Sequence, residues 1–170
     1  MDQSWEKAAE LYRKAAEREN AAGQCNLGFL YEIGKGVEQS WTEAVKWYGA
    51  AARQGMSRAQ CNLGWCYEHG KGVEKNEKRA LHWYRQAAEQ DDPRGLFCMG
   101  VCAKRGIGQE RDIKQAAAWY ERAVKAGYVP AMCNLGVCYE NGEGVEENAA
   151  KAAELYRMAA EREDAAGQCN

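Results

Sequence analysis

The sequence repeats itself with a period of 36 residues. The segment "CNLGFLYEIGKGVE" begins at Cys25 and returns as "CNLGWCYEHGKGVE" at Cys61 and "CNLGVCYENGEGVE" at Cys133, and a diverged copy, "FCMGVCAKRGIGQE", begins at Phe97. A second block of the form "AELYRKAA" keeps the same step along the whole chain. Such a period indicates an array in which each repeat is one supersecondary unit that buries its apolar face by stacking on its neighbours.

Each repeat predicts two helices, which we call helix A and helix B. In helix A, Ala59, Leu63 and Tyr67 are four residues apart and form one apolar stripe. Gly64 lies inside this helix at a cost of about 1 kcal/mol relative to alanine, which favours a close approach by another helix. The pair Gly70 and Gly72 is expected to end helix A and turn the chain.

Helix B is expected to begin at a column of residues with good N-cap side chains. These are Ser4, Ser40, Asn76, Asp112 and Asn148. The predicted buried face of helix B in one repeat consists of Ala44, Trp47, Tyr48, Ala51 and Ala52. Valine, isoleucine and threonine are scarce and only two prolines occur, so the composition indicates an all-α protein.

The period divides the chain into one predicted solenoid domain spanning residues 1–170. We expect a partial repeat at the N-terminus, four full repeats, and the start of another. The boundaries are 1–22 (helix B alone), 23–58, 59–94, 95–130, 131–166 and 167–170.

The recurring residues are those by which the chain resembles Sel-one-like repeat proteins, relatives of the tetratricopeptide repeats. In one repeat they are Ala59, Leu63, Gly64, Tyr67, Gly70, Gly72, Ala80, Trp83, Tyr84, Ala87 and Ala88. The resemblance implies a right-handed superhelical α-solenoid of antiparallel helix pairs, with helix A on the concave side. It also implies a non-enzymatic adaptor or scaffold. Two positions depart from the family, because Glu19 and Asp91 stand where it has glycine at the end of helix B.

By the same resemblance, one face of helix A is expected to line a groove that binds a protein or peptide. The candidate residues are Asn26, Phe29, Glu32, Asn62, Trp65, Glu68, Val101, Lys104, Asn134, Val137 and Glu140, and Asn170 continues the asparagine column. A repeated asparagine amide can donate to and accept from an extended peptide backbone. Trp65 is the predicted anchor. The alternative is that the asparagines bond a neighbouring helix and the aromatic side chains pack between repeats.

Charge and hydropathy indicate which partners to expect. The net charge is −2 and no basic block occurs, so we expect no nucleic-acid partner. No apolar run approaches the roughly 20 residues that span a bilayer, and the N-terminal segment is charged. We therefore expect a protein without a membrane partner, in a cytoplasmic compartment.

No metal, cofactor or catalytic site is predicted. Cys61, Cys66 and His69 lack metal-ligand spacing, and on one helix the two cysteines point about 140° apart. Ser4 and Lys7 match S-x-x-K, but the companion motifs of that enzyme class are missing. All eight cysteines fall in helix A, where pairs on one helix do not reach disulfide geometry, so we expect reduced thiols.

The two ends of the array are nearly the same sequence. Residues 7–26 and 151–170 match at all but two positions, whereas residues 43–62 match the first window much less well. A duplication, a piece of a longer array and an engineered chain would each give this pattern. Since solenoids normally end in polar caps, two open ends predict head-to-tail association into a ring or filament as an alternative function.

Overall fold

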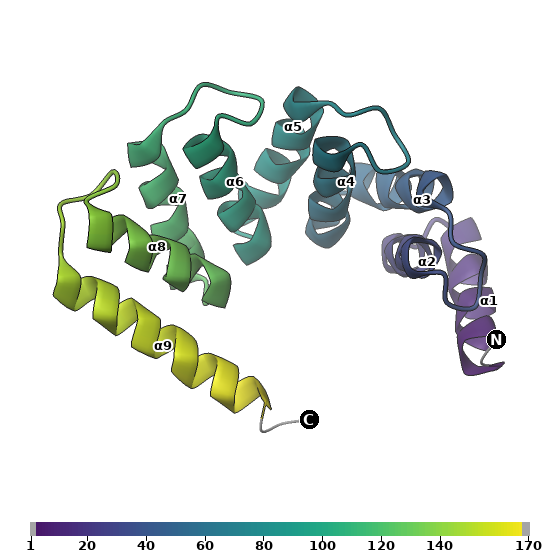
Figure 1. Ribbon diagram of the computed structural model, residues 1–170. Coiled ribbons are helices and arrows are strands. Elements are labelled where there is room, and N and C mark those ends of the chain that lie inside the picture. The colour runs from purple at the N-terminus through teal and green to yellow at the C-terminus, as the bar shows by residue number, and fades with distance from the viewer. Residues whose placement is uncertain (1–2, 168–170) are drawn as a thin grey trace. The chain divides into compact units, whose positions relative to one another are not determined.

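The structure is a computed structural model that describes the backbone of residues 3–167 and the side chains of residues 4–162. Nine helices and no strand occur in this part of the chain (Figure 1). They are α1 (Gln3–Glu17), α2 (Ala21–Ile33), α3 (Trp41–Arg53), α4 (Ser57–His69), α5 (Glu77–Ala88), α6 (Pro93–Arg105), α7 (Ile113–Lys125), α8 (Val129–Asn141) and α9 (Ala149–Gly167). The predicted all-α class is confirmed. None of these described helices has the length and apolar character required to cross a membrane.

The helices form two compact units. The N-terminal unit, residues 1–90, contains α1 to α5, and the C-terminal unit, residues 91–170, contains α6 to α9. Within each unit consecutive helices pack on one another. Helix A of the repeat is α2, α4, α6 and α8, and helix B is α1, α3, α5, α7 and α9. The single solenoid domain expected over 1–170, with its predicted boundaries, stays a prediction.

A glycine in the left-handed conformation ends each helix A, as predicted. Gly34, for example, has φ 67° and its N–H donates to the carbonyl of Leu30. The second glycine of the pair is needed for a different reason. A Cβ on Gly36 would lie 2.1 Å from the carbonyl oxygen of Trp5, so the turn after α2 rests directly on the start of α1. The Gly-x-Gly turn therefore joins neighbouring repeats as well as reversing the chain.

The predicted N-caps of helix B are confirmed at four of the five positions. The side chains of Ser40, Asn76, Asp112 and Asn148 each accept a hydrogen bond from the backbone N–H three residues later. The prediction for Ser4 is wrong, because α1 begins at Gln3 and Ser4 lies in its first turn. At the other four positions a helix A carbonyl, such as that of Tyr31 for Ser40, holds the cap residue's N–H. Among the described residues no helix A precedes α1.

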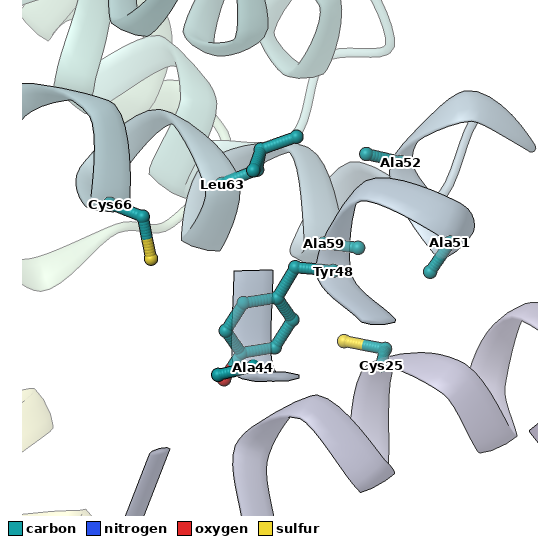
Figure 2. Packing of buried hydrophobic residues seen from close by; sticks show 8 residues of the cluster. All are labelled: Cys25, Ala44, Tyr48, Ala51, Ala52, Ala59, Leu63 and Cys66. Carbon is teal, nitrogen blue, oxygen red and sulfur yellow. The ribbon is translucent and has the colours of Figure 1, made fainter. Parts of the chain in front are cut away.

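The glycine inside helix A admits a tyrosine from helix B. A Cβ on Gly28 would lie 2.8 Å from the ring of Tyr48, and Gly64 has the same relation to Tyr84. Figure 2 shows Tyr48 among Cys25, Ala44 and Ala59, in a cluster that also contains Leu63 of the next helix A. The predicted close approach is thus confirmed, and its partner is an aromatic ring.

Two residues other than glycine take the left-handed conformation at the end of helix B. Glu19 has φ 59° and Asp91 has φ 53°, in the same left-handed region as the equivalent Gly55 (φ 86°) and Gly127 (φ 84°). The turn therefore forms even where the glycine of the family pattern is replaced by another residue. It carries backbone strain at Glu19 and Asp91 that the glycines avoid.

Buried glutamines link neighbouring repeats of the N-terminal unit. Gln24 donates to the carbonyl of Ala16 in the preceding helix B at 3.3 Å and accepts from Gln54 at 2.7 Å. Gln60 and Gln90 repeat the arrangement one period later. At the positions equivalent to Gln24, the C-terminal unit has the apolar Leu96 and Met132, both buried. At this position the N-terminal unit therefore uses a hydrogen-bonded glutamine and the C-terminal unit an apolar side chain.

Candidate functional site

The glutamates of the candidate surface hold the core tyrosines. Glu32 accepts a hydrogen bond from the hydroxyl of Tyr48 at 2.5 Å, and Glu68 accepts one from Tyr84 at 2.7 Å. Burial of the Tyr48 hydroxyl, together with this bond to Glu32, raises its pKa far above the ordinary value. These carboxylates therefore join helix A to its own helix B. The pairing of these glutamates with the tyrosines of helix B was not predicted from the sequence.

The C-terminal unit changes this arrangement at Lys104. Lys104 stands in the glutamate column and pairs with Glu143 at 2.7 Å, in the glycine turn of the next repeat. The hydroxyl of Tyr120 bonds to Asn134 instead, and burial, as the larger effect, raises the pKa of Tyr120 to about 12. Glu140 follows the pattern of Glu32 and Glu68, because its carboxylate accepts a hydrogen bond from the hydroxyl of Tyr156 at 2.9 Å.

The asparagine column also makes contacts within the fold. Asn26 accepts a hydrogen bond from Arg58 of the next helix A, and Asn134 bonds Tyr120 of the preceding helix B. Asn62 is half-buried, and Asn170 lies outside the described residues. The predicted role of this column in a groove stays a prediction.

The residues of the aromatic and apolar column differ in size and exposure between the two units. Phe29 of α2 and Trp65 of α4 are 46% and 38% exposed, and Ile33, one turn after Phe29, is exposed as well. At the equivalent positions of the C-terminal unit, Val101 and Val137 are smaller and half-buried. Large apolar side chains thus face solvent at corresponding positions of adjacent helices A in the N-terminal unit.

Trp65 belongs to a ring cluster that the sequence analysis did not identify. Its ring stacks on that of His69 with centroids 4.5 Å apart and lies 5.6 Å from that of Trp41, at the start of α3. Lys71 of the following glycine turn places its ammonium 5.8 Å from the centroid of Trp41. The four-residue spacing of Trp65 and His69 was the available signal, because residues at that spacing are neighbours on a helix.

The described cysteines are thiols outside any disulfide, and their exposure differs. Cys25, Cys61, Cys66, Cys102 and Cys138 are buried, Cys98 is half-buried and Cys133 is exposed. Burial raises the pKa of the Cys66 thiol to about 12. Cys169 lies outside the described residues. Within the described part of the chain no group of histidine, cysteine, aspartate and glutamate is arranged to hold a metal ion.

The sequence profile of the Sel1 repeat matches the chain five times without a gap. The matched residues are 6–20, 21–56, 57–92, 93–128 and 129–164. The chain belongs to the Sel1 repeat family. From α2 to α9, each matched Sel1 repeat holds one A–B helix pair, and the first match covers most of α1 alone.

Solved Sel1-type structures share this fold. A Sel1 repeat protein from Oxalobacter formigenes is 38% identical with a TM-score of 0.85, over 94% of this chain and 64% of that one. A protective antigen of uropathogenic Escherichia coli with an SLR fold is also 38% identical, with a TM-score of 0.84, over 90% of this chain and 33% of that one. The chain therefore spans less than two thirds of either relative. It matches none of the curated proteins.

A cysteine-rich relative is more distant. Cysteine rich protein B of Helicobacter pylori is 26% identical with a TM-score of 0.59, covering 75% of this chain and 92% of that one.

Sel1 repeats generally serve as scaffolds for protein–protein interaction and are typically non-catalytic. The features of this Sel1 repeat chain that bear on such a role are its exposed apolar side chains.

Proposed function

We propose that the chain is a protein-binding scaffold that holds a peptide segment of its partner on the helix A face of the N-terminal unit. The observation that carries this proposal is the exposure of Phe29 and Trp65 at equivalent positions of adjacent helices A. Neighbouring large apolar side chains at the surface mark interaction sites, and tryptophan is among the residues that most often dominate binding. The proposal includes no catalytic step.

The surroundings of Trp65 favour its role as the anchor. Contacts with Trp41 and His69 restrict its ring, so little side-chain entropy is lost when a partner covers it. The carboxylates of Glu32 and Glu68 are already held by tyrosines, which keeps them fixed beside the apolar column. A partner segment would therefore meet a surface with its main side chains preorganised.

The test uses the full chain and a displayed library of random peptides. Selected peptides should bind the chain at least tenfold more weakly after Trp65→Ala and Phe29→Ala, because hot-spot truncations cost about 1–2 kcal/mol or more. Leu11→Ala is the matched control, since Leu11 is 66% exposed but lies on α1, outside the proposed surface. Equal affinity for the double variant and for the wild type would refute the proposed surface.

A second candidate function, head-to-tail self-association, is favoured by exposure at particular repeat positions. Leu11 of α1 is 66% exposed, whereas the equivalent Leu155 of α9 is 8% exposed. Cys133 is exposed, whereas the equivalent Cys25 and Cys61 are buried. Each of these positions is exposed at one place in the array and buried at these equivalents. Sedimentation equilibrium over a wide concentration range tests this candidate, and a constant monomer mass would overturn it.

A further inference from the structure

Nearly the same sequence has two different structures at the two ends of the array. In residues 7–26, α1 ends at Glu17, the chain turns through Glu19, and α2 begins at Ala21. In residues 151–167, which match the first segment almost completely, α9 continues as one helix to Gly167 (Figure 1). The local sequence therefore does not decide whether this segment turns.

Contacts with α2 hold the turn at the N-terminal copy. Gln24 of α2 donates to the carbonyl of Ala16, and a Cβ on Gly23 would lie 2.6 Å from the Cβ of Ala15. The left-handed conformation of Glu19 costs about 1–2 kcal/mol, so it needs such contacts. In α9, Ala160 is exposed, although its equivalents Ala16 and Ala52 are each 2% exposed.

We propose that α2 of a second copy of this chain packs on α9, in the place that α1 occupies on α2 within one copy. This proposal rests on the self-association candidate and names its interface. The exposed Ala160 would take the position of Ala16 beneath α2, and α1 of the second copy would be released. The Ala16 contact with α2 already present in this structure is the template for that interface.

The two sequence differences between the ends fit this exchange. Lys14, which is replaced by Met158, is exposed and pairs with Glu10 of its own helix at 2.6 Å, so it does not hold α2. Asn20, whose side chain caps α2, is replaced by Asp164, and both residue types are good N-caps. The residues equivalent to Ala15 and Ala16, on which α2 packs, are therefore unchanged in α9.

The exchange is expected to be weak in the wild type. It replaces one set of contacts by a similar set, while α1 is tethered to α2 at an effective concentration on the order of mM. One contact also belongs to α1 alone, because the ammonium of Lys35 lies 4.6 Å from the ring centroid of Trp5 and the residue equivalent to Trp5 is Ala149. Assembly should therefore appear only as the protein concentration approaches mM.

Three variants of the full chain test the exchange by light scattering across concentrations. Ala16→Glu places a charge beneath α2, releases α1, and should lower the concentration of half-assembly at least tenfold. Ala160→Glu should prevent assembly and leave the melting temperature of the monomer unchanged, because Ala160 is exposed in the monomer. The double variant should stay monomeric, which separates exchange from non-specific aggregation of the uncovered α2.

The outcomes separate this proposal from the function on which it rests. Self-association that Ala160→Glu leaves unchanged would overturn the exchange but keep head-to-tail assembly by another contact. A double variant that assembles as readily as Ala16→Glu would also overturn the exchange. Monomers at every concentration, in the wild type and in Ala16→Glu, would overturn both. Peptide binding at Trp65 is unaffected by any of these results.

Discussion

The hydroxyl of Tyr48 donates a 2.5 Å hydrogen bond to the carboxylate of Glu32, a residue on the neighbouring helix. The ring of the same tyrosine lies over Gly28, one turn before Glu32, so a single side chain fixes both the spacing and the orientation of α2 and α3. The same three residue types recur as Gly64, Tyr84 and Glu68. This relationship makes the repeat sensitive to added volume at one specific glycine.

We expect Gly28→Ala to lower the free energy of unfolding by about 1–3 kcal/mol, because its methyl group would overlap the Tyr48 ring. Gly49→Ala in α3 is the matched control, since its Cβ would meet only the flexible end of Arg53, at 3.4 Å. The control should raise stability by about 0.5–1 kcal/mol through helix propensity. Urea denaturation measures both, and equal effects of the two variants would contradict the packing account.

Glu19→Gly should stabilise the protein by about 1 kcal/mol. Glu19 adopts φ 59°, a conformation that costs a residue with a Cβ but not glycine. The reverse change, Gly55→Ala, should destabilise by a similar amount, since Gly55 has φ 86° and no atom lies near its Cβ position. Thermal unfolding of both variants checks the prediction, which fails if Gly55→Ala is neutral.

Stability should fall as the pH rises from about 9 to about 12. Burial raises the pKa of Cys66 and of Tyr120 to about 12, from ordinary values of 9.0 and 10.0. Both groups ionise more readily in the unfolded chain, so their contribution is complete below pH 9 and is lost as the pH approaches 12. Each group weakens folding by about 1.4 kcal/mol per pH unit inside its own window. Denaturant titrations at several alkaline pH values should show a shallower decline for Cys66→Ala than for the wild type.

Thiol reactivity should follow burial. Cys133 is exposed and should be alkylated within minutes, whereas Cys25, Cys66 and Cys138 are buried and should react only after unfolding. Peptide mass spectrometry after a brief iodoacetamide pulse at neutral pH measures the difference. Rapid labelling of Cys25 would contradict the packing of α2 in the core.

Much of the fold could be predicted because it follows from local sequence. The period placed every helix pair, the glycine pairs marked the ends of helix A, and Ser40 and its equivalents marked four starts of helix B. The contacts between side chains of different helices could not be predicted in this way. The Glu32–Tyr48 bond, the buried Gln24 and the ring cluster of Trp41, Trp65 and His69 depend on which side chains meet in space. The incorrect cap at Ser4 has the same origin, because a helix A carbonyl holds the other caps in place.

The two ends of the chain separate these contributions most clearly. Sequence alone determined that residues 7–26 and 151–170 both favour helix and both carry the residues of a turn. Tertiary structure decided that only the first segment turns, at Glu19, because α2 packs on Ala15 and Ala16 and offsets the backbone strain. The described part of α9 has no such neighbour at Ala160, so the helix continues and keeps its hydrogen bonds.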